Sequence, residues 1–203
     1  MLFERGSDMP PKARITKEMI IEAGLSIVRK EGADALNVRR VAAELDCSTQ
    51  PVMYHYKTVE ELKADVYAAA DEFHTEFIMT PDENAGNPAL SIGLRYIRFA
   101  NEEKHLFRFL FQSGKFRSTD LRELISSDEL SPMIQAVCGQ TGLSEMQAKE
   151  AFETLFVCVH GAASMLANND MEFDEAYYVR MLRNIFFGII GVIKGEENNE
   201  KTV

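Results

Sequence analysis

The chain has 203 residues and a formal net charge of −10 at pH 7, and 46% of its residues are hydrophobic, enough to fill the core of one or two compact domains. Its three cysteines form no Cys-x-x-Cys pair, which excludes a disulfide scaffold and indicates a reducing compartment. The longest apolar run, residues 185–193, is shorter than the ~20 residues of a membrane span. We therefore expect a cytoplasmic protein without a membrane anchor, in which this run is a buried helix.

The N-terminal residues contain no apolar run of the kind found in a signal peptide. Met9 offers an alternative start, which would make residues 1–8 an extension. A first helix is predicted from Thr16, a suitable cap, to Glu31, with Gly32 ending it. Its inward stripe consists of Met19, Ile20, Ala23 and Ile27.

Residues 36–57 have the pattern of two short helices joined by a tight turn. Asn37 and Ser48 are suited to cap the two helices, and the turn falls at Asp46-Cys47. The first helix has an apolar stripe at spacings of three and four residues: Val38, Val41, Ala42 and Leu45. This is the pattern of a helix-turn-helix, which places its second helix in the major groove of DNA.

With its flanking helices, the segment 15–67 resembles the N-terminal domain of the TetR family of bacterial transcriptional repressors. The family pattern is a helix ending at Gly, then Leu-Thr-x-Arg-x-Ile-Ala-x-x-Leu-Gly-Val-Ser, then Leu-Tyr-x-His-Phe-x-Ser-Lys-x-x-Leu. It is found here without a gap at residues 32–42, 45–48 and 52–62.

Four positions depart from the family pattern: Asn37 replaces Thr, Asp46 replaces Gly, Met53 replaces Tyr and Val59 replaces Lys. In the family, those Tyr and Lys positions commonly contact DNA phosphates. The resemblance therefore implies that this chain holds the DNA backbone with other groups.

The resemblance implies an all-α protein with a three-helix DNA-binding domain over residues 10–62, which contains the helix-turn-helix. A helical ligand-binding and dimerisation domain would follow over residues 63–203. The charge distribution agrees, because residues 1–57 carry nine Lys and Arg against eight Asp and Glu, whereas residues 58–203 carry thirteen against twenty-four. The positive side chains expected to meet phosphates are Lys12, Arg14, Lys17, Arg39, Arg40 and Lys57.

The second half of the chain is expected to be a set of helices. Thr58 and Glu61 predict a capping-box start for a fourth helix that runs towards Ile78, followed by a loop at residues 80–88. Further helices are expected at 88–103, 104–113, 121–126, 132–140, 144–168 and 174–194. Residues 196–201 are expected to form a frayed polar tail.

The expected DNA contacts lie in and around the second helix of the motif. Gln50 is suited to bidentate pairing with adenine and Thr49 to a thymine methyl or a phosphate; the alternative is a plain solvated surface. Cys47 is interpreted as a buried structural thiol, with a redox sensor as the alternative. The predicted DNA-binding set is Asn37, Arg39, Ser48, Thr49, Gln50, Pro51, Tyr54, His55 and Lys57.

Helices 144–168 and 174–194 are apolar on more than one side and need more than one partner. Interior packing is one explanation, and a four-helix bundle formed by two copies is the other. The resemblance favours a homodimer, as a two-fold operator requires. The predicted dimer interface is Phe152, Leu155, Val159, Gly161, Ala162, Leu182, Ile185, Gly188 and Ile189.

No set of residues has the spacing of a catalytic or metal site, so no enzyme and no cofactor are expected. The resemblance implies instead a small-molecule effector pocket, with Arg95, Arg98, Asn101, Phe156 and His160 as candidates. The predicted function is repression from a pseudo-palindromic double-stranded DNA operator, released by a small hydrophobic effector. Two alternatives are a TetR-like helical protein acting through a protein partner and a small helical enzyme that uses the pocket.

Overall fold

A computed structural model describes residues 15–81, 87–114 and 130–200, except for the side chains of residues 132 and 196–200. In these parts of the chain the regular structure is helical and no strand occurs, which confirms the all-α class. The predicted helix 121–126, the loop residues 82–86, the cations Lys12 and Arg14, and residues 1–8 lie outside the described residues.

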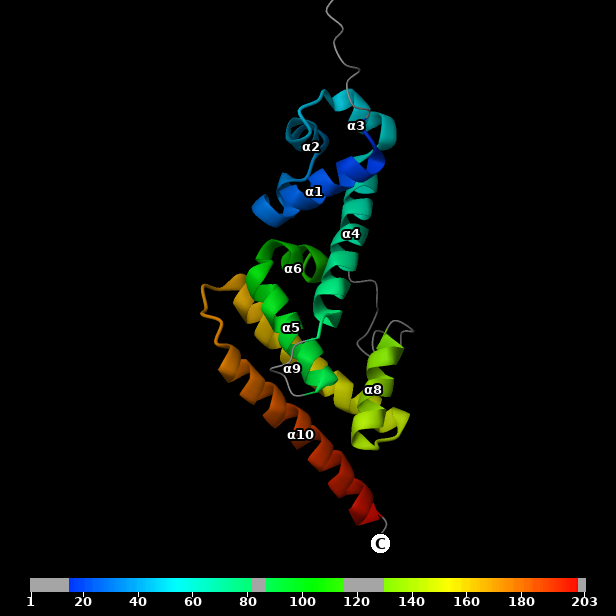
Figure 1. The fold of residues 1–203 in the computed structure, drawn as a ribbon, viewed down its shortest axis with the longest axis vertical. Helices are drawn as coiled ribbons and strands as arrows, with labels where there is room; N and C mark the ends of the chain where they lie inside the picture. Colours follow the sequence, from blue (N-terminus) through cyan, green and yellow to red (C-terminus); the bar gives the residue numbers. More distant parts are fainter. Residues whose placement is uncertain (1–14, 82–86, 115–129, 201–203) are drawn as a thin grey trace, which may run out of the picture.

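A small head of three helices is connected to a larger helical body by the long helix α4 (Figure 1). The head consists of α1 (Lys17–Glu31), a 3-10 turn η1 (Ala33–Ala35), α2 (Val38–Glu44) and α3 (Thr49–His55). The connecting helix α4 spans Val59–Met79. The body consists of α5 (Pro88–Glu102), α6 (Lys104–Phe111), α8 (Ser131–Thr141), α9 (Glu145–Asn168) and α10 (Glu175–Glu200).

Side-chain caps fix most of the predicted helix starts. Asn37 accepts a hydrogen bond of 3.0 Å from the backbone N–H of Arg40, and Thr58 and Glu61 form the predicted capping box. Caps at Thr16, Ser144 and Asp174 are likewise present. At its other end α10 departs from the prediction, because the helix continues to Glu200 instead of fraying after Lys194.

The head, α4 and the body share one hydrophobic core. One continuous cluster of buried side chains extends from Ile20 in α1 to Phe186 in α10, and a smaller cluster joins α8, α9 and α10 at the far end. Helix α5 packs most extensively against α9 and then α4, while α1 packs against α4 and α6. The head therefore rests on the body through α4 and α6.

Polar contacts reinforce this junction between head and body. Arg29 of α1 donates two hydrogen bonds to Glu103, between α5 and α6, the Nε bond being 2.9 Å long. Its guanidinium also lies 5.0 Å from the ring centre of Phe73 in α4. The hydroxyl of Tyr67 in α4 donates to the backbone oxygen of Leu110 in α6 at 3.0 Å. Movement of α6 is thus directly connected to α1 and α4.

Helix α10 lies on the outside of the body (Figure 1). Over Glu175–Gly195 it is long and apolar enough to cross a membrane by length and composition, with a mean hydropathy of 1.3, and 22% of that stretch is buried. The prediction of a buried helix is therefore wrong for one side of α10. Leu182 and Phe186 face the core, whereas Phe187 and Val192 are exposed.

Candidate nucleic-acid interface

The predicted helix-turn-helix is formed by α2, α3 and a tight turn. Asp46 has φ = 47°, the left-handed region that favours glycine but that Asp tolerates better than most residues. This backbone conformation explains why the TetR family pattern, which the segment resembles, has Gly at this position. The backbone N–H of Cys47 returns to the carbonyl of Ala42 at 2.9 Å, which closes the turn. Cys47 itself is half-buried.

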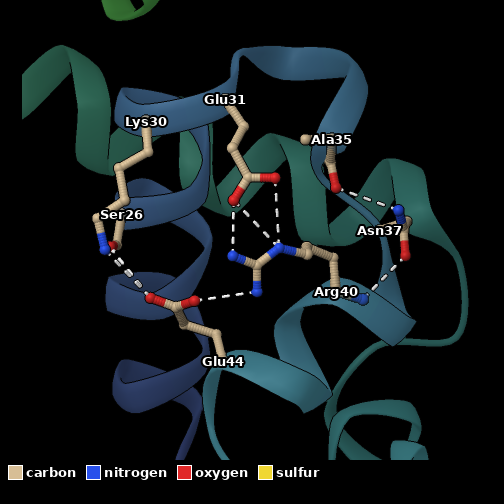
Figure 2. A network of polar contacts seen from close by, with 7 residues as sticks. All are labelled: Ser26, Lys30, Glu31, Ala35, Asn37, Arg40 and Glu44. Atoms are coloured by element: carbon tan, nitrogen blue, oxygen red, sulfur yellow. Dashed lines mark hydrogen bonds and ion pairs between the residues drawn. The ribbon is translucent and has the colours of Figure 1, made fainter.

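Figure 2 shows a network that joins α2 to α1, with the Arg40 guanidinium between two carboxylates. Its Nη2 lies 2.6 Å from Glu31 Oε1, and its Nη1 lies 3.0 Å from Glu44 Oε2. Lys30 approaches the same Glu44 at 3.4 Å. The Arg40 side chain lowers the pKa of both carboxyl groups. Arg40 is therefore occupied in holding α2 on α1, and its prediction as a phosphate contact is not supported by this geometry.

Lys17 is also neutralised inside the protein. Its Nζ lies 2.6 Å from Asp65 Oδ2, and the same carboxylate accepts a 2.8 Å hydrogen bond from the buried Tyr56 hydroxyl. Tyr56 thus packs in the core of the head. Of the head cations that the structure describes, Arg39 and Lys57 are exposed and form no ion pair within the described residues.

The exposed face of α3 carries Gln50, Met53 and Tyr54, and Lys57 follows just beyond its end. Their spacings of three and four residues put them on one side of the helix. Tyr54 is 71% exposed and Met53 is 55% exposed, whereas Val52 on the opposite side is fully buried. This face therefore presents polar, apolar and aromatic groups together, with Lys57 at its edge.

The other predicted DNA contacts differ in how accessible they are. Ser48 is exposed at the start of α3, and its side chain forms no capping bond. Thr49 and Pro51 are half-buried. His55 is half-buried, and its Nε2 lies 3.2 Å from the carbonyl oxygen of Ile15, so it holds the N-terminal end of α1 against α3. Met53 is absent from the predicted set, although its position three residues after Gln50 indicates that it lies on the same face.

The nine predicted dimer residues fall into three groups: buried, exposed and half-buried. Leu155, Val159 and Leu182 are buried inside the protomer, so the prediction that they contact a second copy is wrong for them. The exposed face of α9 and α10 includes the predicted Gly161 and Gly188. It also carries large apolar side chains that the prediction omitted: Val157, Met165, Phe187 and Val192. Phe152, Ala162, Ile185 and Ile189 lie half-buried at its margin.

The predicted effector residues do not form one pocket. Arg95 donates to the carbonyl oxygen of Phe77 at 2.9 Å, and Arg98 pairs with Glu175 at 2.5 Å. Asn101 is half-buried in the last turn of α5. An open cleft of about 710 Å³ lies elsewhere, along the N-terminal half of α10. No group of three or more His, Cys, Asp or Glu suited to a metal occurs among the described residues.

Phe156 and His160 instead belong to an aromatic cluster between α4, α5, α6 and α9. The two rings stack at 5.7 Å, and His160 Nδ1 lies 2.8 Å from the Tyr96 hydroxyl. The cluster consists of His74, Tyr96, Phe99, Phe107, Phe111, Phe156 and His160. His74 is absent from the predicted effector residues. Its position was detectable, because it falls on the buried stripe of α4, which has a step of four residues: Leu62, Val66, Ala70, His74 and Ile78.

No family model matches the chain. The chain is similar to YobS of Bacillus subtilis (strain 168), described as an uncharacterized HTH-type transcriptional regulator, with 21% identity over 198 residues that cover 96% of this chain and 100% of that protein. Its fold is similar to that of a TetR family member from Streptomyces coelicolor A3, with a TM-score of 0.55 and 17% identity over 83% of this chain and 96% of the other. The resemblance to TetR-like regulators is therefore confirmed at the level of the fold.

Proposed function

We propose that this chain is a homodimeric, cytoplasmic, DNA-binding regulator of transcription that represses from a two-fold operator and is released by a small hydrophobic effector. The observation that carries the proposal is the exposed face of α3, where Gln50, Met53 and Tyr54 project together next to Lys57. An α-helix with such a face fits the major groove, where side chains reach base edges. Arg39 adds a second cation that is not paired within the described residues.

The body supports this function through its charge. Residues 58–203 carry the excess of Asp and Glu, so phosphates repel the body and attract the cations of the head. Among the head cations that the structure describes, Arg39 and Lys57 alone are unpaired, so we expect base contacts to add to the affinity for the operator.

Gln50→Ala is expected to weaken binding to the preferred duplex by about 1–3 kcal/mol and to change binding to a scrambled duplex little, because a bidentate base contact is lost. The preferred duplex is first obtained by selection from random sequences, and affinities are then measured by fluorescence anisotropy at several salt concentrations. Gln135→Ala, an exposed position on α8, is the matched control.

Arg39→Ala serves as the contrasting variant in the same assay. It is expected to weaken binding to both duplexes. The slope of log affinity against log salt concentration is expected to become about one unit less steep, because one phosphate contact is lost. Equal losses on both duplexes for Gln50→Ala would show that Gln50 does not read bases.

The dimer is tested at the exposed glycines. A Cβ at Gly161 or Gly188 meets no atom within 4 Å in the protomer, so a side chain at either position starts in open space and we expect the isolated chain to tolerate leucine there. In a dimer that packs these faces closely, the same leucine blocks the approach of the second copy. We expect Gly161→Leu and Gly188→Leu to sediment as folded monomers, whereas the wild type sediments as a dimer.

Gly139→Leu on α8 is the control for this experiment, since it is equally open but lies on another face. It is expected to leave the dimer intact. A wild-type protein that sediments as a folded monomer at micromolar concentration rules out the dimer.

A protein partner in place of DNA is the second candidate, favoured by the exposed apolar side chain of Met53. The anisotropy assay separates the two functions. Binding of duplexes without sequence preference and without salt dependence supports the protein partner.

A further inference from the structure

A buried histidine in α4 has an unused hydrogen-bonding atom. His74 is 6% exposed, and its Nε2 has no hydrogen-bond partner in the described part of the chain. Buried polar atoms are nearly always bonded, and one left unsatisfied destabilises the folded state. Burial lowers the pKa of His74 to about 4, so its ring is neutral at pH 7 and carries one N–H and one acceptor nitrogen. A polar nitrogen is therefore held in an apolar site without a partner, as an acceptor in one neutral tautomer and as a donor in the other.

The ring of Phe111 occupies the space among the polar rings of the aromatic cluster. Its centre lies 5.1 Å from that of His74, 5.5 Å from that of Tyr96 and 5.9 Å from that of His160. Phe111 is the last residue of α6 and is only half-buried, whereas Tyr96 and His74 are buried. A ligand ring that takes the place of Phe111 reaches all three polar groups.

The walls of this space determine the class of ligand. The contacts of His74 with Tyr96, Phe99 and Phe111 are all edge-to-face, an arrangement that accepts another flat ring. Two nearby arginines are occupied, since Arg108 donates to the Ala167 carbonyl at 2.6 and 2.9 Å and Arg95 donates to that of Phe77. Moving a charged ligand from water into this apolar space is unfavourable, because the charge loses its hydration. A neutral ring with one hydroxyl fits best, because a hydroxyl can pair with either neutral tautomer of His74.

We propose that a neutral phenol binds in the space of the Phe111 ring and that its hydroxyl forms a hydrogen bond with Nε2 of His74, donating to it or accepting from it according to the tautomer. That this phenol acts as an effector rests on the proposed function, whereas the binding itself does not. Displacing Phe111 moves the end of α6, next to Leu110, whose carbonyl accepts the bond from Tyr67 of α4. The start of α6 follows Glu103, which is bonded to Arg29 of the head. Ligand binding is thereby connected to α4 and to α1 of the head.

The test compares phenol with benzene, which has the same ring but no hydroxyl. Binding to the DNA-free protein is measured by titration calorimetry and by the shift in unfolding temperature. We expect the wild type to bind phenol more tightly than benzene, and His74→Phe to lose about tenfold of that preference, since one hydrogen bond disappears. Phe111→Ala opens the space and is expected to tighten phenol binding. Phe156→Ala, in the same cluster but not in ring contact with His74, is its matched control.

Three results overturn the inference. The first is equal affinity of the wild type for phenol and benzene, and the second is an unchanged preference for phenol in His74→Phe. The third is that neither the wild type nor Phe111→Ala binds phenol. The first and third need no variant at His74, so misfolding of that variant leaves the test valid. Phenol binding without any binding of duplex DNA contradicts the proposed function alone. Sequence-specific DNA binding without phenol binding contradicts this inference alone.

Discussion

Gly24→Ala is expected to lower the free energy of unfolding by about 1–3 kcal/mol, although alanine favours a helix over glycine by ~1 kcal/mol. A Cβ at this position of α1 lies 2.5 Å from Cγ2 of Val66 in α4 and 3.4 Å from Cδ1 of Leu36. Val66 is fully buried and β-branched, so it cannot rotate away without a clash. Urea unfolding followed by circular dichroism measures the change.

The cause of this destabilisation is tested by a second change at Val66. Gly24→Ala combined with Val66→Ala removes the clashing methyl, and the pair is expected to destabilise less than the sum of the two single changes. Gly139→Ala, whose new Cβ meets nothing within 4 Å, is expected to raise stability instead. Strict additivity of the Gly24 and Val66 effects contradicts the close approach of α1 to α4.

His74→Phe is expected to make the protein markedly more resistant to acid. Burial lowers the pKa of His74 from 6.5 to about 4, so the unfolded chain binds a proton where the folded chain does not. The stability contributed by the neutral ring is complete above pH 6.5 and is lost as the pH falls towards 4. This loss amounts to about 3 kcal/mol at pH 4, and phenylalanine at this position avoids it.

Urea unfolding at pH 7, 5.5 and 4 measures this difference between the wild type and His74→Phe. His160→Phe is the control: burial also lowers the pKa of His160, but this ring is only half-buried and is bonded to Tyr96. We expect a smaller change in acid stability for it. Parallel curves for the wild type and His74→Phe show that His74 is already hydrated in the folded protein.

The two large effects involve the same helix. Val66 faces α1 of the head, and His74, two helical turns later, faces α5 and α6 of the body. Helix α4 therefore connects the candidate DNA-binding face to the candidate effector site through a single row of buried side chains. In the proposed function, a ligand that binds beside His74 must favour the state that does not bind DNA, and DNA must weaken ligand binding by the same factor.

Local features of the sequence were sufficient to predict the motif and the starts of most of the described helices. Asn37, Thr58 and Ser144 accept hydrogen bonds from the first turns of their own helices, so their partners lie three residues away. The apolar spacing of α2 gives the side that faces inward, and the exposed position of Gln50 follows from the same periodicity. These interactions depend on neighbours along the chain, which a sequence displays directly.

Only the tertiary structure decided which side chains meet across helices. Arg40 is neutralised because Glu31 of α1 lies opposite α2, and Leu155 is buried because its side of α9 packs inside the body of the protomer. The ring of Phe111 lies among His74, Tyr96 and His160 because α4, α5, α6 and α9 converge there. Periodicity identifies the buried side of a helix but not the helix that covers it. The pairing of charges, the free surface and the surroundings of a buried histidine therefore follow from packing and not from spacing.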